Sequence, residues 1–326
     1  MSLDDTDQRV TLRQRMDQIR AQGAKASDDD RRLYNTGVVL PHPQEKQARD
    51  FHAQVTFHNT TNATRRQILG ITGDFGAGKS SIAESIAADV IDQGIAVHGR
   101  TLLGTSQDLV RPAFWTNATA SGEADLAEAI TISLGLPPVT RSGDTAAHRL
   151  HRATDQIARS MTTHGFIDDA NMWMSSNRKQ PLTQFTKRAL NELPVTLTII
   201  GKGLLDTPLF LPATSDRADA DAANQLRRRL VLVSVEPIPT TGEGPADFRR
   251  LVHAAAAMFL LRSSQPEKDL GAAELAYLHD STRGCVGILF ERLCWSATQA
   301  VGGTERITLG LLRRASSRMA PEWDRR

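Results

Sequence analysis

The chain has 326 residues, of which 23% are charged and 40% hydrophobic, and its formal net charge is +2. A chain of this length can bury a large core and accommodate one to three domains. The nearly neutral charge balance neither requires nor excludes nucleic acid as a partner.

Cysteine usage and hydropathy limit where the protein is expected to work. The two cysteines, Cys285 and Cys294, have neither metal-ligand spacing nor a second pair, which is typical of a reducing compartment. The N-terminus lacks the positive and apolar regions of a secretory signal, and the longest apolar run, 254–261, is far too short to cross a bilayer. We therefore expect a soluble, cytoplasmic protein with no membrane association.

Residues 1–45 are charged and poor in large apolar side chains, with a helix-compatible segment over 10–19. This stretch is predicted to be a polar arm that is either mobile or ordered by a partner. The sequence becomes apolar and proline-rich at 38–43, and a helix is expected over 44–56. The folded core is predicted to begin there.

The most specific motif lies at residues 73–80, Gly-Asp-Phe-Gly-Ala-Gly-Lys-Ser, which matches the phosphate-binding P-loop pattern G-x-x-x-x-G-K-S/T in full. A short apolar run at 67–72, typical of a buried parallel strand, precedes it, and apolar residues at helical spacing follow over 81–87. A strand that leads through the loop into a helix is the structural context that this pattern requires.

The residue types of the loop suit a nucleoside triphosphate. Gly73, Gly76 and Gly78 let the backbone turn so that successive N–H groups and the positive end of the helix dipole point into one concavity. Lys79 is expected to reach the β- and γ-phosphates of ATP, and the Ser80 hydroxyl to complete a Mg²⁺ shell. The alternative is a glycine-rich turn with an exposed lysine and serine. The other members of the predicted ATP site in this segment are Asp74, Phe75, Ala77 and Ser81.

Strands and helices alternate after the P-loop. Strands are predicted at 95–97 or 100–103 and then at 165–167, 195–200 and 230–235. Helices are predicted at 125–134, 145–161, 182–193 and 219–229. This alternation predicts an α/β fold with a parallel sheet of P-loop topology, flanked by helices.

Beyond residue 244 the strand signals stop. Helices are predicted at 246–262, 272–278, 286–300 and 307–319, which indicates a small helical domain at the C-terminal end. The predicted organisation is therefore a polar arm at 1–45, a P-loop nucleotide-binding domain at 46–243 and a helical lid domain at 244–326.

An acidic pair follows the short strand at 165–167. Asp168 and Asp169 resemble a Walker B strand end, in which the first residue holds Mg²⁺ through water and its neighbour polarises the attacking water. Asp169 occupies the place usually held by Glu and is one methylene shorter, so ATP hydrolysis is expected to be slow. The alternative is two solvated aspartates that cap the following helix.

Three further groups are candidates for contact with the nucleotide. Lys202 ends a central strand, where an open α/β sheet places its ligand-facing groups, and is a candidate γ-phosphate sensor rather than a surface lysine. Arg227–Arg229 end a helix, and consecutive helical residues point about 100° apart, so no single partner takes all three. Arg228 or Arg229 is the candidate for an arginine finger that acts on a neighbouring subunit, with helix-dipole capping as the alternative. Arg283 is a candidate second sensor.

The order of these motifs resembles the AAA+ ATPases, and within them the TniB/TnsC-type transposition ATPases, which are relatives of the phage Mu B protein. The P-loop is the highly specific part of this resemblance, and the segments at 185–203 and 225–229 are moderately specific. The segments that carry the resemblance are 40–43, 73–81, 167–171, 185–203, 225–229 and 283–293.

This resemblance implies an ATP-dependent protein that binds duplex target DNA, assembles into rings or helical filaments and recruits a transposase, with a target-selection protein as a further partner. Asp169 stands where the family usually has Glu, and Lys202 where it often has a small hydroxyl residue. Both departures bear on the rate of hydrolysis rather than on nucleotide binding.

Two other classes stay open from the residues alone. A P-loop kinase needs an acceptor pocket and a lid, and the arginine triplet and the helical tail argue against it. An AAA+ or STAND-like signalling switch binds a protein instead of DNA, and the nearly neutral net charge is compatible with it.

Overall fold

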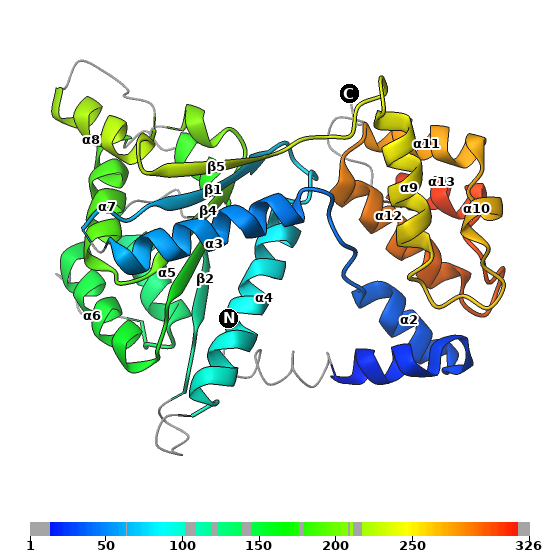
Figure 1. Ribbon diagram of the computed structural model, residues 1–326, viewed down its shortest axis with the longest axis horizontal. Coiled ribbons are helices and arrows are strands. Elements are labelled where there is room, and N and C mark those ends of the chain that lie inside the picture. Colours follow the sequence, from blue (N-terminus) through cyan, green and yellow to red (C-terminus); the bar gives the residue numbers. More distant parts are fainter. Residues whose placement is uncertain are drawn as a thin grey trace. The chain divides into compact units, whose positions relative to one another are not determined.

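The computed structural model describes residues 14–62, 64–101, 109–118, 123–138, 145–175, 179–207, 209–210 and 217–318. These residues form two compact units (Figure 1). Unit 1 contains 44–75 and 79–235, and unit 2 contains 14–43, 76–78 and 236–318. The three-part division at 45/46 and 243/244 stays a prediction. Within the described ranges, no helix is both long and apolar enough to cross a membrane.

Unit 1 is built on a five-stranded sheet in the order β2-β3-β4-β1-β5. Every neighbouring pair is parallel, so the carboxyl ends of all the strands lie at one edge. The strands are β1 (Ile68–Gly73), β2 (Ala113–Asn117), β3 (His164–Asp168), β4 (Thr196–Gly201) and β5 (Leu230–Val235). The predicted α/β fold with a parallel sheet flanked by helices is confirmed.

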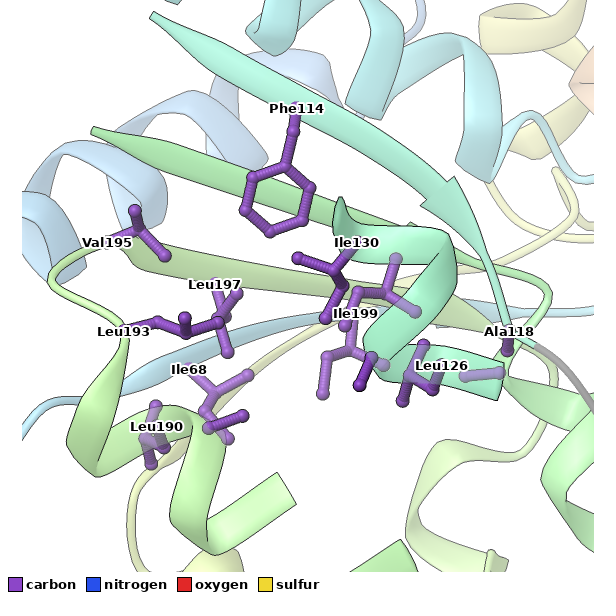
Figure 2. Close-up of a cluster of buried hydrophobic side chains, with 14 of the residues drawn as sticks. Ile68, Phe114, Ala118, Leu126, Ile130, Leu190, Leu193, Val195, Leu197 and Ile199 are labelled. Atoms are coloured by element: carbon purple, nitrogen blue, oxygen red, sulfur yellow. The ribbon is translucent and has the colours of Figure 1, made fainter. Parts of the chain in front are cut away.

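One face of the sheet forms the main hydrophobic core (Figure 2). Side chains alternate between the two faces of a strand, so Leu197 and Ile199 of β4 point to the same side. They join Ile68 of β1 and buried residues from the helices that cover this face. These helices are α5 (Glu123–Ser133), α6 (Ala146–Arg159), α7 (Lys179–Glu192) and α8 (Arg217–Arg227), close to the predicted bounds.

The other face of the sheet carries a group of buried rings under α3 (Glu45–Thr61). The ring centroids of His52 in α3 and His164 in β3 are 4.9 Å apart, and His52 also stacks on Phe166 at 6.5 Å. His164 is held by Thr56 Oγ1 at 3.2 Å from Nε2 and by Thr163 Oγ1 at 2.8 Å from Nδ1. Both imidazoles are therefore packed away from water.

The strand predicted at 95–97 was wrong, because these residues lie inside α4 (Lys79–His98). Gly94 does not interrupt this helix. It is the point where Pro112 packs closest, since an added Cβ would lie 2.3 Å from Pro112 Cγ. In the alternative segment at 100–103, Thr101 forms only an isolated antiparallel bridge with Leu109, and residues 102–103 lie outside the described ranges. The strand that the sequence missed is β2.

Unit 2 is helical and has its own apolar core. An N-terminal helix covers 14–22, and the residues of the predicted helix at 10–13 lie outside the described ranges. The predicted helix at 286–300 matches α12. The helix predicted at 246–262 ends earlier, at Ala256, and the short helix at 266–269 was not predicted, whereas the helices predicted at 272–278 and 307–319 lie near their predicted positions. The helices of unit 2 include α2 (Asp28–Gly37), α9 (Gly244–Ala256), α10 (Pro266–Asp269), α11 (Ala272–Thr282), α12 (Val286–Ala300) and α13 (Leu309–Arg318).

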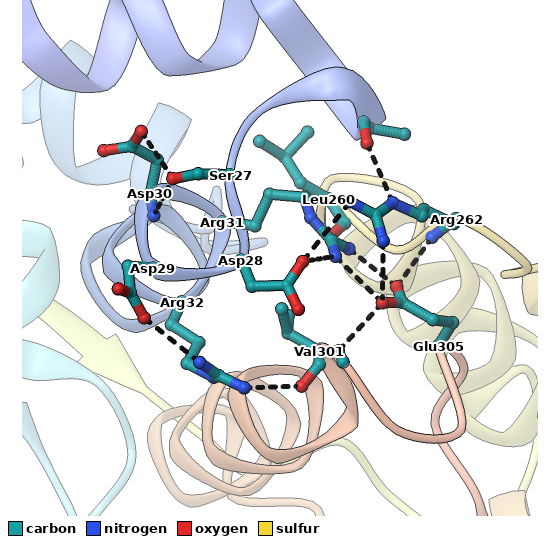
Figure 3. Close-up of polar contacts among 12 residues, drawn as sticks. Ser27, Asp28, Asp29, Asp30, Arg31, Arg32, Leu260, Arg262, Val301 and Glu305 are labelled. Carbon is teal, nitrogen blue, oxygen red and sulfur yellow. Dashed lines mark hydrogen bonds and ion pairs between the residues drawn. The ribbon is translucent and has the colours of Figure 1, made fainter.

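A buried arginine ties α2 to the end of the chain within unit 2 (Figure 3). The Arg31 side chain is fully buried, and its guanidinium donates to both carboxylate oxygens of Glu305 at 2.6 and 2.8 Å and to Asp28 at 2.7 Å. It also donates to Leu260 O at 3.2 Å. These bonds lower the pKa of Glu305 to about 2 and raise that of Arg31, so both groups stay charged.

The histidine pair predicts how the stability of unit 1 depends on pH. Burial lowers the pKa of His52 to about 4 and that of His164 to about 3, from an ordinary value of 6.5. Below pH 6.5 the unfolded chain therefore binds protons that the folded chain does not, and stability is lost as the pH falls. Each pH unit should cost about 1.4 kcal/mol per histidine until the folded pKa is reached.

Denaturant unfolding between pH 7.5 and pH 5 measures this slope. The variant His164→Gln should flatten it, whereas the same change at the exposed His151 should leave it as in the wild type. Equal slopes in all three proteins would show that the buried pair does not set the pH dependence.

The contacts of Arg31 with Glu305 and Asp28 predict that Glu305→Gln destabilises unit 2 strongly. This change leaves the buried Arg31 charge without its bidentate partner, while Asp28 still accepts one bond. We expect a loss of about 3 kcal/mol in the free energy of unfolding of unit 2, at the low end of the range for breaking a buried pair. The control is Asp29→Asn, which removes a carboxylate that is 95% exposed and pairs with Arg32. Denaturant unfolding should show no change there, and a similar loss in both variants would contradict the assignment.

Candidate functional site

Parallel pairing brings the predicted site residues of unit 1 to one edge of the sheet. The register pairs Thr72 in β1 with Gly201 in β4, and Ile167 in β3 with Ile199 in β4. The segments that follow these three strands therefore start side by side. They are the P-loop, Lys202 and the acidic pair, and this carboxyl edge is where open α/β sheets bind ligands.

The local geometry requires glycine at two positions of the P-loop. Gly73 passes so close to β5 that an added Cβ would lie 2.2 Å from Val235 O, so no larger residue fits. Gly78 has φ +100°, a conformation that L side chains rarely adopt. The turn between β1 and α4 therefore depends on glycine at both ends, as the phosphate-binding pattern requires.

The middle of the P-loop, Gly76–Gly78, groups with unit 2. His42 is buried, and its Nε2 lies 2.8 Å from Ala77 O. The backbone N–H of Ile288, near the start of α12, donates to Gly76 O at 3.1 Å. Sequence reasoning did not single out His42 as a site residue. Its signal was a histidine between Pro41 and Pro43, in a segment that carries part of the family resemblance.

Lys79 begins α4, and its ammonium group lies among several charges. Its Nζ donates to the backbone carbonyl of Asp74 at 2.7 Å. Burial lowers the pKa of Lys79, while the negative charges of Asp168, Asp74 and Asp169 act in the opposite direction. The side chain predicted to bind phosphate is thus a cation at the end of the loop, close to the carboxylates of β3.

Lys202 reaches the same loop from β4. Its Nζ is 2.8 Å from Asp74 Oδ1, and both side chains are about half exposed, at 48% and 60%. The exposed Phe75 ring lies under both ammonium groups, with its centroid 5.3 Å from Lys202 Nζ and 5.9 Å from Lys79 Nζ. The structure therefore brings together Asp74, Phe75, Lys79 and Lys202.

The acidic pair lies at the end of β3. Asp168 accepts a 2.8 Å bond from the backbone N–H of Asp169, and the Asp169 side chain is exposed. Asp169 has φ +56°, which is uncommon outside glycine and is typical of residues held for a function. Its backbone carbonyl accepts from Met172 N, so Asp169 directly precedes the short helix η3 (Ala170–Ser175).

The donor set fits Mg²⁺ bound together with phosphate. Ser80 and Ser81, at the start of α4, are both exposed, and Asp168 supplies a half-buried carboxylate. In the part of the chain that the structure describes, no three His, Cys, Asp or Glu side chains gather closely enough to hold a metal. A hydroxyl, one carboxylate and phosphate oxygens are what Mg²⁺ commonly uses in such sites.

The arginine triplet lies at the opposite edge of the sheet from the P-loop. Helix α8 ends at Arg227, so Arg228 and Arg229 form the turn into β5 rather than the helix end that was predicted. Arg229 O accepts from Ile68 N at the first residue of β1. The six residues of β1 separate this turn from Gly73 by roughly 20 Å. These arginines therefore do not reach the P-loop of their own chain.

The two finger candidates differ in their contacts. Arg229 donates to Asn191 Oδ1 at 3.0 Å, on α7, while Arg228 is exposed. The candidate second sensor, Arg283, lies in unit 2, where it ends α11 with φ +51° and is exposed. Arg283 and the cluster around Asp74 thus belong to different units.

Comparison with known proteins gives the fold. No protein-family model and no curated protein matches the chain. Among solved structures, Orc1 of Aeropyrum pernix in complex with DNA matches with a TM-score of 0.60 and 16% identity, over 88% of this chain and 67% of that one. Orc2 of the same organism, in ADPNP–ADP complexes, matches with a TM-score of 0.55 and 14% identity over 86% and 70%.

A third match is Cdc6p of Pyrobaculum aerophilum, with a TM-score of 0.53 and 13% identity, over 86% of this chain and 69% of that one. At these identities the likeness concerns the fold. The chain shares with these structures an α/β fold with a parallel sheet, a P-loop and C-terminal helices.

Proposed function

We propose that the chain is an AAA+ ATPase that binds duplex DNA in an ATP-dependent manner and regulates DNA transposition, as a cytoplasmic protein that self-associates. The observation that carries the nucleotide part is the carboxyl edge of the sheet. There a complete P-loop, an acidic strand end and Lys202 converge in an AAA+ fold. The same edge binds ligands in open α/β sheets generally.

The residues of the P-loop have distinct proposed roles toward Mg²⁺–ATP. Gly73 and Gly78 keep the backbone close enough for N–H groups to face the phosphates, and Lys79 neutralises their charge. Ser80 and Asp168 hold the metal, which when bound shields the charge on the transferred phosphoryl group.

Hydrolysis depends on two further groups in this proposal. Asp169 orients and deprotonates water, and its short side chain makes the step slow. Arg228 acts on a neighbouring subunit, since it is exposed and lies at the sheet edge away from its own P-loop. Arg229 is already bonded to Asn191 and is the weaker candidate for the finger.

DNA binding and a role in transposition are supported by different observations. Orc1, which this chain resembles in fold, was solved in complex with DNA. The resemblance of the motifs to TniB/TnsC-type ATPases supports duplex DNA, a ring or filament, and a transposase with a target-selection protein as partners. A signalling switch that binds a protein is the second candidate, favoured by the net charge of only +2.

The variant Lys79→Ala should abolish ATP binding, because the loop loses its cation while its glycines keep its shape. In thermal melts, Mg²⁺–ATP at 100 times its Kd should stabilise the wild type by about 2.7 kcal/mol and leave the variant unchanged. Lys187→Ala, in α7, is the control for loss of one positive charge and should respond as the wild type does. Equal shifts in the wild type and in Lys79→Ala would rule out the P-loop as the site.

DNA binding should require ATP and should weaken steeply with salt, because phosphate contacts release counterions. Gel shifts of a DNA duplex over a series of salt concentrations, with ATP and with no nucleotide, measure this. Electron micrographs of the ATP–DNA sample should show rings or filaments. Monomers that bind ATP but not DNA would favour the signalling switch.

A further inference from the structure

We propose that Asp74 lowers the affinity of the site for nucleoside triphosphates, but not for diphosphates, by holding Lys202 until a γ-phosphate takes it. This inference rests on the proposed function, because it requires nucleotide to bind at the P-loop. Asp74 is the second residue of the loop, at a position where the phosphate-binding pattern allows any residue.

Asp74 contacts both lysines of the site at once. Its backbone carbonyl accepts from Lys79 Nζ at 2.7 Å, and its carboxylate pairs with Lys202 Nζ at 2.8 Å. One residue therefore contacts the ammonium groups of both lysines. A bound phosphate group has to compete with Asp74 for each of them.

Phe75 helps to hold the two cations together. Both ammonium groups lie within 6 Å of its ring centroid, where the face of an aromatic ring attracts a cation. The positive charge of Lys202 disfavours the charged form of Lys79, and the Asp74 charge offsets this repulsion. The carboxylates of the acidic pair act on Lys79 in the same direction as Asp74, so an entering anion meets two cations that already face several carboxylates.

The position of Lys202 selects the γ-phosphate. It follows β4, which pairs directly with β1, so it flanks the start of the loop, whereas Lys79 begins α4. A triphosphate places one more anionic group beyond the β-phosphate, toward Lys202. A diphosphate lacks that group, so Lys202 stays with Asp74.

The ion pair is weak enough to be exchanged. Both side chains are about half exposed, and pairs of this kind contribute little in water. The need to break the pair should therefore lower the affinity for a triphosphate by about two- to fivefold, relative to a site in which Lys202 is unpaired. The effect should be larger at low ionic strength, since exposed charges are screened by salt.

A double-mutant cycle isolates this pair. The wild type, Asp74→Asn, Lys202→Met and the double variant are titrated calorimetrically with Mg²⁺ and either ADP or adenosine 5′-(β,γ-imido)triphosphate. Both residues are exposed, so the variants should fold, which a melt without nucleotide checks. Lys187→Met controls for the loss of one positive charge elsewhere on unit 1.

Asp74→Asn should raise triphosphate affinity about two- to fivefold more when Lys202 is present than when it is methionine. Asp74→Asn also removes the repulsion between the Asp74 carboxylate and the phosphates. This effect is the same with Lys202 present and in the Lys202→Met background, so it cancels in the cycle. For ADP the coupling should be absent, because the pair stays intact in the free and bound states.

The outcomes separate this inference from the proposed function. If the wild type binds neither nucleotide, the proposed function fails. If both bind, but Asp74→Asn has the same effect with and without Lys202, or the coupling is equal for ADP and the triphosphate, then Asp74 does not act on triphosphate affinity through Lys202.

Discussion

Parallel pairing of β1 with β4 and β5 is the constraint on which the rest of unit 1 depends. Because all strands run in one direction, their carboxyl ends share one edge and their amino ends the other. The P-loop, Lys202 and the acidic pair follow carboxyl ends, and the arginine turn precedes the amino end of β5. The same hydrogen bonds that hold the sheet together thus place the P-loop, Lys202 and the acidic pair at one edge and the arginine turn at the other.

Charge balance, rather than any single strong contact, defines the chemistry of the carboxyl edge. Two lysines lie beside Asp74, and the charges of Asp168 and Asp169 act on the same ammonium group of Lys79. These groups are partly exposed, so their mutual interactions are weak and exchangeable. A site arranged in this way accepts a multiply charged ligand with little reorganisation, because the ligand replaces contacts of similar strength.

In unit 2 the main electrostatic feature is a buried arginine whose charge is paired. Arg31 is fully buried on α2, far in sequence from Glu305, and its charge is matched by two carboxylates and a backbone carbonyl. Leu260 N also donates to the buried Asn35 of the same helix. The bonds to Glu305 and Leu260 join α2 to residues more than 200 positions away in the sequence.

The fold class and the nucleotide motif were determined by the sequence alone. The P-loop at 73–80 and the β-branched strands at 195–200 and 230–235 are local patterns, and local sterics and hydrophobic periodicity suffice to recognise them. The strand predicted at 95–97 was wrong because a run of three residues does not distinguish a short strand from the last turn of a helix, and these residues continue α4.

Tertiary structure decided which charged residues meet. Nothing in the spacing of Asp74, Lys202 and Phe75 shows that they share one cluster, because contacts between strands depend on register and not on distance along the chain. The buried His42 beside Ala77 and the pairing of Arg229 with Asn191 also join residues far apart in the sequence, so no local pattern shows them. Arg227 and Arg228 are both exposed. Local sequence therefore identified the P-loop pattern, and the register of the sheet determined the charges around it.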